Sequence, residues 1–370
     1  MRILFCLSWL LFSAVTHAVN VDLFPLQKTD KGLPVIQHLS APESLRPCCA
    51  FGYDLHVRAA GIPIPVYQIG NILTVETLGS HRFNDSSLAA LENIAGISQE
   101  KNGLIYTHRG GFIDIAHVRD TADNTLFLFS KIAPLLGHEQ RFFLTEELGV
   151  RRVQMNAFTA PTSSGQRYTL AAWLAGHLAF ELAQWHEVAQ WYGFQSVPGF
   201  SEEISAFSPE DLYSNLLGAR IAIQVILQGH AGTLAEYNHA MDKQLITSLI
   251  RLEATPKSVT AEKFRQIDGV WWNSKRRVPD KFLVLNRNYD LSEQRYPMPV
   301  SFEAAPPYLL TFPEHIGKYS LKSLGELQIY SGHQMKGLPE PAHFYNQLDF
   351  VPLAVKAKEA DDIQLQKLNK

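Results

Sequence analysis

Apolar residues recur with the period of an α-helix through the middle of the chain, over residues 84–268. A short helix is expected over 86–96, and a longer one over 112–136, directly after a Gly-Gly pair. The next predicted helix covers about 166–192. Its pattern carries both large aromatic residues and the sequence HEVAQ, in which a histidine is followed directly by an acid.

Two further helices carry clear start signals. The third opens on a capping Ser208, with Pro209 as its first helical residue, and stays apolar nearly all round to Gly229. Such a helix is expected to lie buried at the centre of the fold. The fourth begins with a capping box at Thr233 and ends before Pro256. Lengths near twenty residues and short connections favour an antiparallel bundle.

The flanking segments have a different pattern. Residues 19–83 are rich in Pro, Gly and β-branched residues, and 61–79 alternate as one or two strands would. Residues 269–355 are short apolar runs that predict strands and long loops covering the bundle, and 356–370 predict a charged, mobile tail. The expected class is therefore α+β, a single domain over 19–355 with a central, mostly antiparallel helical bundle and N- and C-terminal β/loop segments.

The first eighteen residues have the features of an export signal. Arg2 precedes an apolar stretch over 3–15, and Thr-His-Ala at 16–18 supplies a small-residue cleavage site. The chain is therefore expected to be exported into an oxidising space, with an uncleaved membrane anchor as the alternative. After the first twenty residues there is no apolar run of eighteen, which predicts no transmembrane span in the mature chain.

Composition narrows the function further. The 370 residues are 46% hydrophobic and 19% charged, with a net charge of −3, which offers no basic surface for nucleic acid. Beyond the signal, Cys48 and Cys49 are adjacent and are the only cysteines, which excludes a framework of structural disulfides. A vicinal disulfide, two buried thiols and one nucleophilic thiol remain open.

The helix over 166–192 carries the most suggestive chemistry. His186 and Glu187 match the start of the zinc-hydrolase pattern His-Glu-x-x-His, in which the glutamate takes a proton from bound water. Gln190 replaces the second histidine, so two other residues would have to complete the site. His177 and Glu181 also share a face, but nine positions separate the two histidines and place them on opposite sides of a regular helix. The second pair is therefore expected in an outer shell or in a second metal site.

Candidates for the missing ligands lie on neighbouring segments. Downstream of the helix, Glu202, Glu203 or Glu210 would supply a carboxylate. From the helix over 112–136, Asp114 and His117 stand at the spacing by which bundle helices offer a carboxylate and an imidazole to a metal. The carboxylate can instead orient the histidine, and a polar stripe of this kind also occurs where a helix simply faces water.

Two other interpretations fit the same residues. A thiol hydrolase or acyltransferase would use Cys48 or Cys49 as nucleophile and His117 as base, with Asp114 or Asp120 as the acid that orients it. Alternatively, the His and Glu residues are structural, and the chain is an envelope binding or assembly protein. No Gly-x-Ser-x-Gly elbow, phosphate-binding loop or dinucleotide fingerprint is present.

Read in order, the segments RPCCAFG, GGFIDIAHVRD, WHEVAQWYG and SEEISAFSPEDLYSNLLG resemble a family of exported bacterial proteins known only as domain of unknown function 4056. The resemblance runs from about residue 46 to the segments after 271. With the export signal, it implies a protein in the periplasm of a Gram-negative bacterium. It supplies no activity and no catalytic residue.

The leading hypothesis is a metal-dependent hydrolase acting on a small molecule, a peptide, an ester or an envelope polymer. His117, His186 and one of Glu203 or Glu210 would bind Zn²⁺ or another divalent metal, and Glu187 would activate water. Two observations are expected to decide this. One is whether His117 and His186 approach within about 5 Å of each other, roughly twice a metal–ligand bond. The other is whether both imidazoles face one water-reachable cavity lined with carboxylates.

Overall fold

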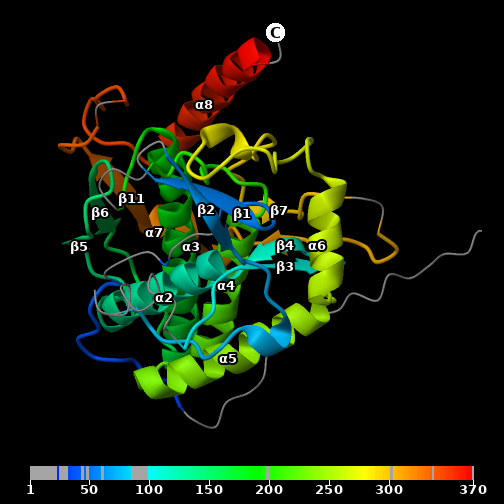
Figure 1. Ribbon diagram of the computed structural model, residues 1–370. Coiled ribbons are helices and arrows are strands. Elements are labelled where there is room, and N and C mark those ends of the chain that lie inside the picture. The colour runs from blue at the N-terminus through cyan, green and yellow to red at the C-terminus, as the bar shows by residue number, and fades with distance from the viewer. Residues whose placement is uncertain are drawn as a thin grey trace, which may run out of the picture.

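The computed structural model describes residues 23–24, 32–42, 46, 50–59, 62–84, 99–196, 201–300, 303–335 and 337–368. A helical bundle lies at its centre, surrounded by small antiparallel sheets, which confirms the α+β class (Figure 1). The bundle consists of α2 (Ile115–Ile132), α3 (Ser164–Trp191) and α4 (Asp211–Leu227), with α5 (Leu234–Arg251) packed beside α4.

All paired strands within the described ranges run antiparallel. One sheet has three strands in the order β11-β6-β5, and the others are pairs. The strands are β1 (Leu55–Ala59) with β2 (Ile62–Ile69), β3 (Leu104–Thr107) with β4 (Gly111–Asp114), β5 (Gln140–Phe143) and β6 (Val150–Met155) with β11 (Gly325–Tyr330), β7 (Gln294–Arg295) with β8 (Leu310–Thr311), and β9 (His315–Ile316) with β10 (Tyr319–Ser320). The remaining helices are α6 (Lys257–Gln266), α7 (Leu321–Leu324) and α8 (Gln347–Leu368), with 3₁₀ turns at Val75–Thr77, Ala133–Leu135 and Lys281–Leu283.

Two predicted helices are confirmed, and each begins within two residues of its predicted first residue. The helix expected over 166–192 is α3, which is buried at nearly every position from Tyr168 to Gln190 because small alanines and large apolar residues alternate around it. The helix expected from Thr233 is α5, and the Thr233 side chain accepts a hydrogen bond from the Glu236 N–H. The short helix expected over 86–96 and the export signal lie outside the described residues.

The helix expected from residue 112 begins three residues later. Phe112 to Asp114 belong to β4, which pairs with β3 through a turn where Gly111 has φ +64°. Asp114 then ends the strand and caps α2, because its Oδ1 accepts hydrogen bonds from the N–H groups of Ala116 (2.7 Å) and His117 (3.3 Å). The prediction was wrong at this boundary, since the apolar period of the helix continues without a break into the strand.

The start of α4 also differs from the prediction. Ser208 does not cap the helix; its hydroxyl donates to Oε2 of Glu210 (2.8 Å), and the helix begins at Asp211. The preceding Phe207 has φ +56°, a strained backbone conformation for a bulky residue. As a result, the acids at 210 and 211 lie at the buried end of α4 instead of in an exposed first turn.

The segment expected to be a mobile tail is part of α8. Asp361 is buried there, 2.8 Å from the Lys281 Nζ, and accepts hydrogen bonds from the Tyr289 hydroxyl (2.6 Å) and the Trp191 indole (3.1 Å). The charged composition predicted mobility, but one acid of the segment has partners distant in sequence. The free end of α8 projects from the body of the molecule in Figure 1.

The C-terminal strands cover the bundle as expected and share its core. Leu310 in β8 and Leu327 and Ile329 in β11 belong to the same buried apolar cluster as the three central helices. A second cluster packs Phe51, Phe112 and other aromatic residues beneath α6. Among the helices of the described ranges, none is both long enough and apolar enough to cross a membrane.

A glycine sets the contact between α2 and α4. A Cβ atom at Gly218 would lie 2.1 Å from the carbonyl oxygen of Val118, inside van der Waals contact with the backbone of the facing helix. The two helices can therefore approach this closely only while position 218 has no side chain.

We expect Gly218→Ala to lower the free energy of unfolding by about 1–3 kcal/mol, because the backbone of α2 must shift to admit the methyl group. Gly165→Ala is the matched control. It lies in the first turn of α3, where an added Cβ meets nothing closer than 3.9 Å, and it should be neutral or stabilising by up to about 1 kcal/mol. Urea unfolding of both variants measures the difference; equal effects would contradict the steric account.

Candidate metal centre

The ends of three elements meet at a group of buried donor atoms. Asp114 ends β4, His117 lies in the first turn of α2, and Asp211 begins α4. One ligand atom from each side chain lies within 4.8 Å of the others, and the two aspartates are fully buried. Two ligands on opposite sides of one zinc-like ion would be about 4.4 Å apart, so this group is close to the size of a metal site.

Asp211 is the most unusual member of this group. It is 0% exposed, and neither carboxylate oxygen has a hydrogen-bond partner. The closest basic atom within the described ranges is Nε2 of His117, 3.3 Å from Oδ1, in a geometry that does not make a hydrogen bond. A buried carboxylate without hydrogen bonds is costly unless it is protonated or binds a cation.

His117 is held in the form that a metal requires. Its Nδ1 lies 3.3 Å from the amide nitrogen of Asn215, which donates to it, so Nε2 faces Asp211. Burial and the neighbouring His186 lower the pKa of His117 to about 3. The imidazole is therefore neutral at ordinary pH, and a neutral imidazole is the metal-binding form.

Two more buried carboxylates adjoin the group. Glu187 accepts a hydrogen bond from the N–H of the strained Phe207 (2.5 Å), and Glu210 accepts one from the Ser208 hydroxyl. Each keeps its other oxygen without a partner. Burial raises the pKa of Glu187 to about 7 despite the attraction of His186, and burial with mutual repulsion raises the pKa values of Glu210 and Asp211 well above the ordinary range. The cluster is therefore short of positive charge.

His117 and His186 face one cavity, as the bundle hypothesis expects. Their ring centres are 6.3 Å apart, and both line a cavity of about 40 Å³, which is room for a few water molecules. Nδ1 of His186 is hydrogen-bonded to Glu147, whose other oxygen binds Arg151 (2.5 Å). Burial disfavours the charged His186 ring, but Glu147 outweighs it and raises the pKa of His186 to about 9.

The other predicted ligands lie elsewhere or have other partners. Glu203 is partly exposed and lies 4.0 Å from the Lys281 Nζ, so it is not part of the donor group. His186 is paired with Glu147 and is likewise outside the three-residue group. Gln190, which stands where the zinc motif has its second histidine, donates to Glu202 (3.3 Å). Of the carboxylates expected downstream of α3, the structure therefore brings Glu210 to the cluster and not Glu203.

His177 and Glu181 lie outside this centre. His177 pairs with Glu293 (3.1 Å) and with Glu181 (3.5 Å), and Glu181 accepts from the N–H of Leu327 in β11 (2.9 Å). Neither residue lines the cavity beside His117. Their contacts fasten the C-terminal segments to α3. Cys48 and Cys49 lie outside the described residues.

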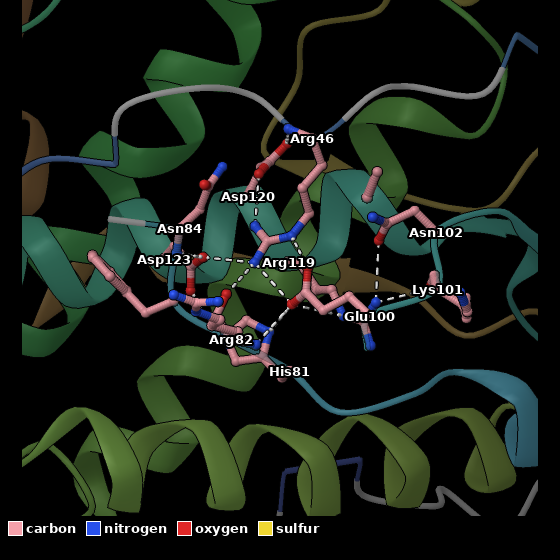
Figure 2. A network of polar contacts seen from close by, with 12 residues as sticks. Arg46, His81, Arg82, Asn84, Glu100, Lys101, Asn102, Arg119, Asp120 and Asp123 are labelled. Atoms are coloured by element: carbon pink, nitrogen blue, oxygen red, sulfur yellow. Dashed lines mark hydrogen bonds and ion pairs between the residues drawn. The ribbon is translucent and has the colours of Figure 1, made fainter. Parts of the chain in front are cut away.

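A second polar network supports the cavity from the N-terminal side (Figure 2). The Arg46 side chain is 0% exposed and forms ion pairs with Glu100 (2.8 Å), Asp120 (2.7 Å) and Asp123 (3.0 Å). His81 binds Asp123 on the far side (3.0 Å). Because Arg46 and Asp120 also line the cavity, this network holds the Arg46 side chain against α2 at the edge of the cavity.

Sequence reasoning missed Asp211, Glu147 and Arg46. Asp211 reads as an ordinary acid in the first turn of a helix, which favours such residues wherever they lie. Glu147 lies in a loop 39 residues before its partner His186, and no spacing rule connects them. Arg46 lies two residues before Cys48, and nothing in the sequence shows that it is buried.

Comparison with known sequences and structures gives a family and no activity. No curated protein and no solved structure matches the chain. The sequence profile of the family described as protein of unknown function (DUF4056) matches residues 36–301, which include every residue of the metal centre and its cavity. The chain therefore belongs to the DUF4056 family.

Proposed function

We propose that this protein is a metal-dependent hydrolase of the bacterial envelope, with a divalent ion bound by Asp114, His117 and Asp211. The observation that carries the proposal is the Asp211 carboxylate, which is fully buried, has no hydrogen-bond partner, and lies in one group of ligand atoms with an aspartate and a neutral imidazole. Two carboxylates and one imidazole suit Zn²⁺, Mn²⁺ or Fe²⁺.

The cavity beside His117 supports hydrolysis in particular. It holds water-sized space against His117, the member of the donor group that lines it, and His186 lines it with Nδ1 already bound to Glu147. In the neutral form that prevails above its pKa of about 9, the remaining ring nitrogen of His186 can accept a proton from a water molecule that attacks a carbonyl carbon, and can return it to the leaving group. A bound ion would polarise the carbonyl and make the water more acidic.

This assignment moves the base from Glu187 to His186. Glu187 does not line the cavity, and one of its oxygens is occupied by the Phe207 N–H. The pair of Glu147 and His186 has the arrangement by which a carboxylate fixes the orientation of a basic imidazole. The zinc-hydrolase resemblance of the HEVAQ segment is therefore replaced by a site built from different residues.

The test is metal analysis combined with a hydrolase assay. Mature protein stripped with EDTA and reloaded with Zn²⁺ or Mn²⁺ should retain at least one ion per chain and should hydrolyse members of a panel of nitrophenyl esters, peptides and cell-wall fragments only when loaded. His117→Gln should lose both properties. His177→Gln is the control, a buried α3 histidine outside the centre, and should keep both.

Two outcomes would overturn the proposal. Hydrolysis that survives EDTA and is abolished by iodoacetamide would support the thiol enzyme that uses Cys48 or Cys49. Ion binding with no hydrolysis of any panel member, in protein that keeps the ion through purification, would indicate a structural metal in a binding or assembly protein.

A further inference from the structure

We propose that the centre binds a second divalent ion, held by Glu187 and Glu210 with Asp211 shared between the two ions. The inference rests on the proposed function, because the first ion on Asp114, His117 and Asp211 provides one half of the pair. Two ions about 3.5–4 Å apart bridged by a carboxylate form a common hydrolytic arrangement.

The unpartnered oxygens indicate where the second ion would bind. Glu187 and Glu210 are 0% and 3% exposed, and each has one oxygen with a donor and one without. The Phe207 N–H and the Ser208 hydroxyl hold the occupied oxygens. Each carboxylate is therefore oriented by the protein, and its second oxygen remains available to a cation.

Asp211 is suited to bridge two ions because both of its oxygens lack hydrogen-bond partners. A single ion needs only one of them. The carboxylates that act most strongly on Asp211 are Glu210, Glu187 and Asp114, so acids of both half-sites surround it. A bridging carboxylate uses both oxygens and leaves neither unsatisfied.

Full ionisation of the carboxylates would favour two divalent ions over one. Four carboxylates meet here, at Asp114, Glu187, Glu210 and Asp211, and carry four negative charges when ionised. Arg287 acts on the cluster from nearby but donates its hydrogen bonds to the carbonyl groups of residues 204, 206 and 281, and Arg295 donates to those of 290 and 292. Neither forms an ion pair with Glu187 or Glu210 in the described part of the chain. Two divalent ions would balance the four charges, and one would leave two buried charges without compensation.

The two half-sites should differ in affinity. The donor atoms of Asp114, His117 and Asp211 already lie within 4.8 Å, whereas no such group in the described ranges includes Glu187 or Glu210. A second ion must draw these two carboxylates together against their repulsion. Binding should therefore occur in two steps, with the Asp114–His117–Asp211 step tighter.

The experiment is a stoichiometric Mn²⁺ titration of the metal-free full chain, followed by electron paramagnetic resonance and by metal analysis after desalting. Wild type should saturate at two ions and give the broadened spectrum of a coupled pair. Glu187→Gln and Glu210→Gln should each saturate at one ion and give the spectrum of an isolated Mn²⁺. Glu181→Gln is the matched control, because Glu181 is also buried in α3, also has a pKa raised to about 7 by burial, and also accepts one backbone N–H. It should still bind two ions.

Saturation of wild type at one ion, or two ions in both the Glu187→Gln and Glu210→Gln variants, would overturn the second site. In either case a first ion that disappears in His117→Gln leaves the proposed function standing. No ion bound at all would overturn both proposals. Using two variants guards against one that fails to fold, since circular dichroism identifies it and the other still decides the outcome.

Discussion

Replacement of Arg46 by methionine is expected to lower the free energy of unfolding by about 3–5 kcal/mol. The guanidinium is fully buried and is the shared partner of Glu100, Asp120 and Asp123. Methionine keeps much of the aliphatic stem but cannot form an ion pair with the three acids. Among the remaining cations of the network, Arg119 lies 3.7 Å from Glu100. Removing one partner of a buried ion pair leaves an uncompensated charge, and that charge causes most of the loss.

Urea unfolding followed by circular dichroism at neutral pH measures this loss. Arg141→Met is the control, because Arg141 is an exposed residue of β5 and its replacement should change stability by no more than about 0.5 kcal/mol. A loss below 1 kcal/mol for Arg46→Met would show that the network in Figure 2 does not depend on its central cation.

Replacement of Asp211 by asparagine should have opposite effects with and without metal. Without an ion, the variant should be at least as stable as wild type, because the substitution removes a buried carboxylate that has no hydrogen bonds. With an ion at 100 times its dissociation constant, wild type should gain about 2.7 kcal/mol and the variant almost nothing. The affinity of the variant for the ion should fall by more than roughly 10- to 100-fold, the loss that is typical when a residue that only hydrogen-bonds to a metal ligand is replaced.

Thermal unfolding with and without Mn²⁺ or Zn²⁺ measures both effects in one experiment. Asp290→Asn, in an exposed loop, is the control and should keep the full response to metal. If the Asp211→Asn variant responds to metal as wild type does, the ion does not bind at Asp211. If the metal-free variant is much less stable than wild type, the carboxylate has a structural partner in place of a metal.

The sequence predicted best those elements whose signals are local. Thr233 caps α5 through its own side chain, and the apolar run of α3 is long enough to be unambiguous. Prediction was wrong where a tertiary contact decides the outcome. The charged segment that contains Asp361 forms an ordered helix, because Asp361 contacts Lys281 and Tyr289. These two residues lie eighty and seventy-two positions earlier in the chain.

The same limit applies to the candidate site. Asp114 and His117 were singled out because they stand three residues apart, a recognised ligand spacing, although Asp114 ends β4 and caps the helix that carries His117. Asp211 was not, because its burial depends on the packing of α4 against α2, and an exposed acid at a helix start has the same local sequence. The HEVAQ segment drew attention to the part of α3 where His186 lines the cavity, but a motif cannot show that His186 has Glu147 as its partner.

The close approach at Gly218 has a consequence for the donor group. Asp211 lies seven residues before this glycine, which is about two turns along the same face of α4. An α-helix moves along its length as a nearly rigid body. The backbone contact between Gly218 and Val118 therefore limits how closely Asp211 can approach His117. In the proposed metal centre, selectivity for ionic radius would thereby be set at a position that no ion touches.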